Sequence, residues 1–92
     1  MNKENLIAQG KEILKLIHPI LIPLFGDESR ELGVRQEDIP KVREWVKDLR
    51  LFSLKIENKS IIDEFNELKI YDQHNRVNKD AILLVIRILE LI

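Results

Sequence analysis

The stretch from Asn78 to Ile92 constrains the fold of this chain more than any other part of the sequence. From Ala81 onward only Arg87 and Glu90 carry charge, and every other residue is apolar. On a helix that turns about 100° per residue, these apolar side chains spread over roughly 220°, about twice the width of the stripe on an ordinary surface helix. Asn78 is well placed to cap this helix. So wide an apolar surface needs cover on two sides, so we expect this helix to lie at the centre of the core.

The composition favours helices throughout. Leu and Ile supply most of the 45% apolar residues, aromatic residues make up only 5%, and threonine is absent. Because Leu and the straight-chain charged residues favour helix, we predict an all-α fold, a compact bundle of four or five helices. With 92 residues the chain corresponds to a single domain, 1–92. Its end at Leu91-Ile92, without a glycine cap or a polar tail, also fits an N-terminal fragment of a longer protein.

The first predicted helical region covers residues 6–24, where apolar residues recur at three-to-four spacing. Pro19 and Pro23 interrupt it, because each lacks a backbone donor and clashes with the preceding turn. We therefore expect a helix to about Ile17, then a kink, and then a short second piece. That second piece is expected to end at Gly26, which suits a left-handed helix terminus.

A charged loop over 27–38 and two further helices are predicted before the last helix. Pro40 suits the first turn of a helix, and the apolar residues that follow it keep helical spacing. Trp45 on this helix is the largest side chain in the protein and is expected to anchor the packing. The next helix is predicted to begin at a Ser60 cap and to fade near Tyr71.

Charge and composition argue against several classes of protein. The net charge is −1 and the estimated pI about 6.1, so no global field attracts the chain to nucleic acid or to anionic membranes. Cysteine is absent, which excludes disulfides and thiolate metal sites. The N-terminus does not resemble a signal peptide, and the apolar runs are far shorter than the roughly 18 residues that a membrane span needs. We predict a cytoplasmic protein with no membrane partner.

The sequence shows no constellation for catalysis, metal binding or cofactor binding. The two histidines, His18 and His74, have no partner at metal-ligand spacing. The three glycines are isolated, so no phosphate-binding loop is present. A calcium loop over 27–38 would need a glycine where Leu32 stands and a glutamate where Asp38 stands. We predict that the protein is not an enzyme and has no catalytic residues, metal site or cofactor.

Nucleic-acid binding is the alternative function. Arg43, Lys47 and Arg50 form a basic stripe at i, i+4 and i+7 on the helix that contains Trp45, and such a stripe can follow a phosphate backbone. Because acidic residues share this helix and the whole chain is slightly acidic, we favour a solvated face with local salt bridges as the explanation of the stripe.

Binding of a protein partner is the leading hypothesis. One side of the last helix is expected to be covered by the other helices, whereas the other side is only partly covered. The candidate partner surface consists of Leu83, Leu84, Ile88 and Leu91. The predicted function is therefore that of a non-enzymatic helical interaction module (an adaptor, a sensor or an oligomerisation module) with a protein partner or a second copy of itself.

A resemblance supports this hypothesis. It is carried by an opening Asn5–Leu14 segment, Arg43-Glu-Trp45 followed by Leu49 and Phe52, Ser60, Glu64-Phe65, and the final Ala81–Leu89 helix. In order and spacing these features resemble the small helical modules at the N-terminus of some bacterial defence-associated proteins. The resemblance implies an adaptor or sensor role ahead of a downstream effector domain, and it implies no catalytic residue.

Overall fold

A computed structural model describes residues 2–24, 27–72 and 75–92, with side chains described outside 21–30. Within these residues the chain forms four α-helices, one short 3-10 helix and one two-stranded sheet. In chain order they are α1 (Lys3–Leu16), β1 (His18–Leu24), β2 (Asp27–Gly33), η1 (Gln36–Asp38), α2 (Ile39–Ser53), α3 (Lys59–Glu67) and α4 (Lys79–Leu91).

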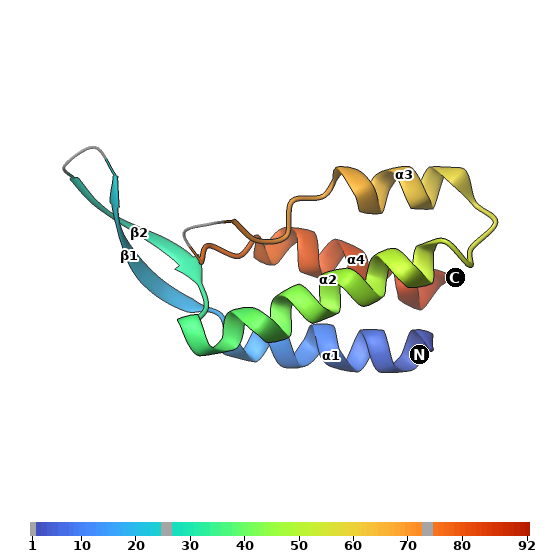
Figure 1. The fold of residues 1–92 in the computed structure, drawn as a ribbon, viewed down its shortest axis with the longest axis horizontal. Coiled ribbons are helices and arrows are strands. Elements are labelled where there is room, and N and C mark those ends of the chain that lie inside the picture. Colours follow the sequence, from blue (N-terminus) through green and yellow to red (C-terminus); the bar gives the residue numbers. More distant parts are fainter. Residues whose placement is uncertain (1, 25–26, 73–74) are drawn as a thin grey trace.

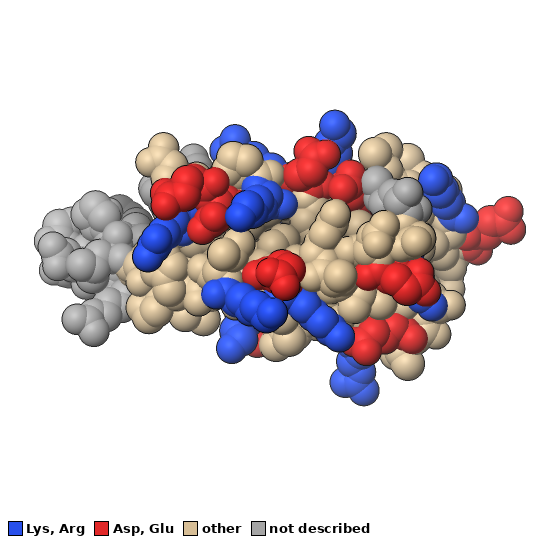
Figure 2. Space-filling view, turned by 90° about the horizontal axis from the view of Figure 1, so that it is seen from below, with Lys and Arg blue, Asp and Glu red and all other residues tan. Residues whose placement is uncertain are grey.

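The molecule is elongated, with extents of 46 × 22 × 19 Å. The four helices lie alongside one another, and the β1–β2 hairpin projects from one end of this helical body (Figure 1). On the face shown in Figure 2, Lys and Arg side chains are interspersed with Asp and Glu side chains and with uncharged surface. No single sign of charge dominates that face.

The hairpin corrects the all-α prediction. β1 and β2 pair antiparallel, from His18 with Gly33 to Leu24 with Asp27. α1 ends at Leu16, so the second helical piece does not form, and strand β2 occupies most of the predicted charged loop. Gly26, the predicted terminator of that piece, lies outside the described residues. The all-α prediction is therefore correct for the four helices and wrong for β1 and β2.

Two prolines explain why the chain leaves the helix here. Each would cost about 3 kcal/mol inside a helix, and the residue before a proline also avoids helical geometry. In an antiparallel pair, residues alternate between positions that bond to the partner strand and positions that point away. Pro19 and Pro23 are an even number of residues apart, so both fit positions where the missing N–H faces the free edge of β1. The segment therefore tolerates both prolines as a strand.

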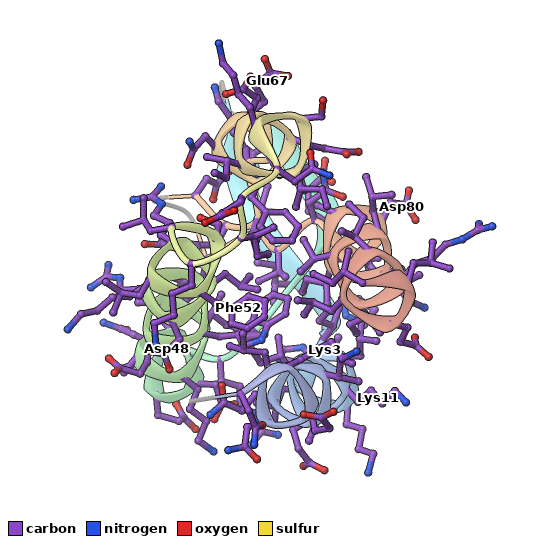
Figure 3. All side chains as sticks on the ribbon, turned by 90° about the vertical axis from the view of Figure 1, so that its right-hand side faces the viewer. Lys3, Lys11, Asp48, Phe52, Glu67 and Asp80 are labelled. Atoms are coloured by element: carbon purple, nitrogen blue, oxygen red, sulfur yellow. The ribbon has the colours of Figure 1, made fainter. Side chains whose placement is uncertain are left out.

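The helices surround one apolar core. Seen end-on, Phe52 points inward, whereas Lys11, Asp48, Glu67 and Asp80 point outward (Figure 3). The buried apolar side chains are Leu6, Ile13, Val34, Ile39, Val42, Trp45, Leu49, Phe65, Ile70, Val77, Ala81, Ile82, Val85, Ile86 and Leu89. α4 packs mainly on α1, and α3 packs mainly on α2. The helix predicted to be central is thus one of four around the core, with one buried face and one exposed face.

Trp45 ties α1 and α2 together, and it is almost completely buried at 1% exposure. Its indole Nε1–H donates to the carbonyl oxygen of Leu6 at 2.8 Å. Gly10 makes this approach possible, because a Cβ there would lie 2.8 Å from Cζ2 of Trp45 and 3.1 Å from Cδ1 of Ile86. Three helices therefore meet at one glycine.

Asparagine side chains cap the last two helices. The predicted Asn78 cap of α4 is confirmed, since its side chain accepts from the Ala81 N–H at 3.1 Å. The predicted Ser60 cap is wrong. Asn58 caps α3 instead by accepting from the Ile61 N–H at 3.3 Å, and Ser60 lies within the first turn.

The chain between α3 and α4 is pinned to the sheet. α3 ends at Glu67, before the predicted end near Tyr71, and Tyr71 pairs with Val77 in an antiparallel bridge. The returning segment also adds to the base of β2, where the Val77 N–H donates to the Leu32 carbonyl at 3.0 Å. Gly33 permits this contact, because a Cβ there would overlap the carbonyl oxygen of Asn75.

Candidate functional site

The predicted partner residues lie on the exposed face of α4. Leu83, Leu84 and Leu91 are 45%, 38% and 77% exposed, and Ile88 is half-buried against the core. At about 100° per residue, Leu91, Leu84 and Ile88 are neighbours around the helix. We call these four residues the α4 outer strip. The strip presents large apolar side chains to solvent.

Two opposite charges, Arg87 and Glu90, lie on the same side of Leu84, Ile88 and Leu91 around the helix. Arg87 and Glu90 are both exposed and lie three residues apart. Neither forms an ion pair with another residue in the described part of the chain. The exposed face of α4 therefore combines apolar contact area with one cation and one anion that are available to a partner.

The basic stripe is exposed along α2. Arg43, Lys47 and Arg50 all face solvent. The interpretation as a solvated face predicts salt bridges with Glu44 or Asp48. Within residues 2–24, 27–72 and 75–92 no ion pair involves any of the three basic residues. Their positive charge is thus not compensated by a direct partner there.

The structure divides this stripe. Between α2 and the segment after α3 lies a hollow of about 620 Å³, which we call the cationic hollow. It is lined by Arg43, Val46, Arg50, Asn66, Leu68, Lys69, Ile70, Tyr71 and Asp72. Arg43 and Arg50 belong to it, whereas Lys47 does not. Sequence reasoning did not select Lys69 and Tyr71, although the alternation around the apolar Ile70 is a signal of extended chain that could have indicated them.

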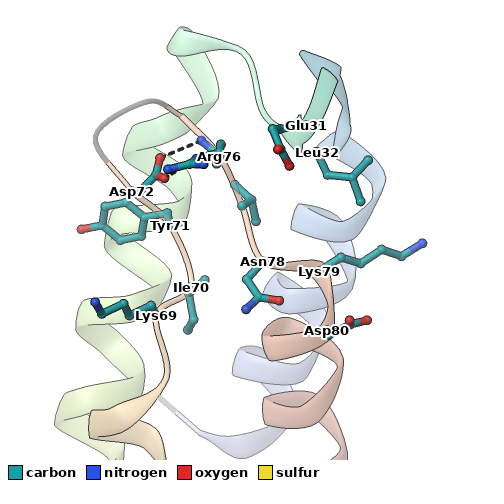
Figure 4. Close-up of a pocket in the computed structure, with 11 residues that line it drawn as sticks. Glu31, Leu32, Lys69, Ile70, Tyr71, Asp72, Arg76, Asn78, Lys79 and Asp80 are labelled. Atoms are coloured by element: carbon teal, nitrogen blue, oxygen red, sulfur yellow. Dashed lines mark hydrogen bonds and ion pairs between the residues drawn. The ribbon is translucent and has the colours of Figure 1, made fainter. Parts of the chain in front are cut away.

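A neighbouring hollow of about 410 Å³ lies between β2, residues 69–72 and 76–78, and the start of α4. Figure 4 shows Glu31 and Leu32 on one side of it and the Asp72–Arg76 ion pair on the other. Lys79 and Asp80 also line this hollow, so its lining contains both acidic and basic side chains. This balance of charge gives it no preference for a cation or an anion.

A third hollow, of about 620 Å³, lies between α1 and α2 and includes Ile13, Pro40 and Trp45 in its lining. Its floor consists of residues that build the contact between these helices, so its shape follows from the packing of Trp45 against α1. Its described lining contains no histidine and no hydroxyl-bearing side chain.

His18 does not line any of the hollows described above. His18 opens β1, with Nδ1 2.9 Å from the carbonyl oxygen of Pro19, and its Nε2 is buried without a hydrogen-bond partner in the described residues. His74 lies outside the described residues. Among the residues that are described, no group of three His, Asp or Glu side chains is placed to hold a metal ion. None of the helices described is long and apolar enough to span a membrane.

No protein-family model, no curated protein and no solved structure matches this chain.

Proposed function

We propose that this protein is a non-enzymatic helical interaction module, and that its α4 outer strip binds a second copy of the chain. The exposure of Leu84 and Leu91 on a helix whose other face belongs to the core supports this proposal most directly. Adjacent exposed apolar side chains of this size are typical of contact surfaces, whereas single exposed leucines need no explanation.

The charges favour a second copy as the partner. In a two-fold contact, each residue pair occurs twice with the roles exchanged. If two α4 helices cross antiparallel near Arg87 and Ile88, Leu84 lies opposite the partner's Leu91. In that register Arg87 and the partner's Glu90 differ by two residues along the axis, about 3 Å. One flank of the contact is then apolar, and the other carries two symmetry-related ion pairs between Arg87 and Glu90.

An adaptor or sensor role follows naturally from such a contact. A small module that dimerises brings together whatever is attached to it or bound by it. This role agrees with the one implied by the resemblance to modules of bacterial defence-associated proteins. We propose it as the use that the protein makes of the α4 contact.

Light scattering coupled to gel filtration tests the proposal. We expect the mass of the wild-type chain to rise from monomer to dimer between about 10 µM and about 1 mM. A contact made by a few apolar side chains and two ion pairs is small, so the dimer should be weak. Leu91→Glu should abolish the rise. Leu54→Glu is the matched control, because Leu54 and Leu91 are 73% and 77% exposed but only Leu91 belongs to the strip. A chain that stays monomeric over the whole range, or equal effects of the two variants, would refute the proposal.

A charge exchange tests the register independently. Arg87→Glu and Glu90→Arg should each weaken the dimer, since each places like charges opposite one another. The double variant should restore it, because the ion pairs re-form with their signs exchanged. If the double variant is weaker than both single variants, the antiparallel register is wrong.

A small nucleic-acid-binding regulator is the second candidate function. The observation that favours it is that Arg43, Lys47 and Arg50 form no ion pair with described residues. Binding through such cations weakens as salt displaces the protein from the phosphates. A titration with DNA and RNA at low and high salt tests it, and absence of binding at low salt would eliminate this function.

A further inference from the structure

The cationic hollow is built by a short extended segment that follows α3. Ile70 is 6% exposed and points into the core. Its carbonyl accepts from the Asn78 N–H at 2.8 Å, and Tyr71 pairs with Val77, so the backbone is held on both sides of the segment. Because side chains alternate along extended chain, Lys69 and Tyr71 project together to the other face. Figure 4 shows both pointing away from Asn78.

α2 supplies the opposite wall of the hollow. Arg43 and Arg50 are seven residues apart, close to two helical turns, so they lie on the same face about 10 Å apart along the axis. Val46 lies between them and forms an apolar floor together with Leu68. The hollow therefore has an arginine of α2 at either end of an apolar floor.

The charge of this hollow differs from that of the whole protein. Arg43, Arg50 and Lys69 form no ion pair with another described residue, in a chain with a net charge of −1. Asp72 is the one acid in the described lining, and both its oxygens interact with Arg76: Oδ1 accepts from the backbone N–H at 3.1 Å and Oδ2 pairs with Nε. The hollow is thus locally positive and suits an anion.

We propose that the cationic hollow binds a nucleotide unit, that is, a phosphate joined to an aromatic base. Arg43, Arg50 and Lys69 would bind the phosphate, since guanidinium groups match phosphate geometry with paired N–H donors. The Tyr71 ring would stack against the base, as aromatic side chains do in single-strand binding sites. The volume of about 620 Å³ lies in the usual range for small-ligand sites and suits one such unit.

This site is separate from the α4 contact and makes the second candidate function more specific. It differs from a simple stripe on α2, because it uses Arg43 and Arg50, leaves out Lys47 and adds Lys69 and Tyr71 from another segment. The nucleotide unit has two sources, a free nucleotide or a single-stranded nucleic acid. Both share the phosphate and the base that the hollow recognises.

Fluorescence anisotropy of a labelled single-stranded oligonucleotide of about ten residues tests this inference. Arg43→Gln, Arg50→Gln and Lys69→Gln should each weaken binding roughly tenfold, the equivalent of one charge-assisted hydrogen bond. Lys47→Gln is the matched control, because it removes the same charge from the same helix outside the hollow. It should weaken binding less than about twofold. Equal losses in all four variants, or no binding at low salt, would overturn the inference.

Competition experiments test the role of the base and distinguish the two sources. Displacement of the strand by adenosine monophosphate but not by inorganic phosphate supports a base contact and assigns a free nucleotide. If neither competitor displaces the strand, while the Arg43, Arg50 and Lys69 variants still bind it more weakly than Lys47→Gln does, the ligand is a single-stranded nucleic acid. Equal competition by inorganic phosphate overturns the role of the base. Tyr71→Phe should keep the affinity and Tyr71→Leu should reduce it several-fold. Leu91→Glu should leave this binding unchanged, so the two proposals can fail separately.

Discussion

Gly10→Ala provides the sharpest test of the helical packing, because two effects of opposite sign compete at this residue. Replacing glycine by alanine inside a helix normally stabilises it by about 1 kcal/mol. At Gly10, however, the new Cβ would lie 2.8 Å from Cζ2 of Trp45 and 3.1 Å from the Ile86 side chain. The indole ring would have to move by about 0.7 Å to restore an ordinary carbon–carbon contact near 3.5 Å.

Trp45 has little freedom to make that movement. It is 1% exposed, and its Nε1–H is held by the Leu6 carbonyl at 2.8 Å. Overpacking of this kind costs about 1–3 kcal/mol, and a stretched or broken buried hydrogen bond adds about 1 kcal/mol or more. After the gain in helix propensity is subtracted, we expect Gly10→Ala to lower the free energy of unfolding by about 1–3 kcal/mol. The midpoint of thermal unfolding should fall by about 4–8 °C for each kcal/mol.

Urea denaturation followed by tryptophan fluorescence measures this effect directly, because Trp45 is the one tryptophan in the chain. Ala8→Gly is the matched control, since Ala8 is exposed on the same helix and reports propensity alone. We expect it to cost about 1 kcal/mol. If Gly10→Ala instead stabilises the protein by about as much as Ala8→Gly destabilises it, Gly10 has room for a methyl group and the packing described for α1, α2 and α4 is wrong.

Further substitutions test the caps and the base of the hairpin. Asn78→Ala should lower the free energy of unfolding by about 1 kcal/mol in urea denaturation, whereas Asn78→Asp, which keeps the acceptor, should cost little. Asn58→Ala should cost a similar amount and Ser60→Ala almost nothing; the reverse order would restore the cap to Ser60. Gly33→Ala should cost about 2 kcal/mol or more, because its Cβ would overlap the Asn75 carbonyl, and hydrogen exchange should report loss of protection at that junction. Unchanged exchange there would contradict the close approach.

The helices were predictable because their signals are local. Pro40 opens α2 within its first turn, and the apolar spacing around Trp45 places the buried face correctly. For α4, the same spacing and the Asn78 cap gave the start of the helix and its apolar arc. The angular positions also indicated the side of α4 that other helices cover only in part, and Leu83, Leu84 and Leu91 are exposed there.

The hairpin was missed because a run of apolar residues fits a strand and a buried helix equally well. Between Pro19 and Pro23 every residue is apolar, so the run itself carries no period. The decisive signal was the pair of prolines, which a helix tolerates poorly and an edge strand tolerates well. The cationic hollow was missed for another reason. Lys69 and Arg50 line the same hollow because the extended segment is fixed by its pairing with the residues before α4, and that pairing is a tertiary contact.

The packing of α1 on α4 has a consequence for how the protein is made. These two helices form the most extensive helix–helix contact, yet residues 17–78 separate them in the chain. During synthesis the ribosome releases α1 well before it has made α4, the principal packing partner of α1. Until then the apolar face of α1 around Gly10 lacks the cover of α4, so the nascent chain depends on its α1–α2 pair to avoid misassociation. Closure of this long loop should therefore limit the folding rate, and joining α1 directly to α4 by circular permutation should speed folding.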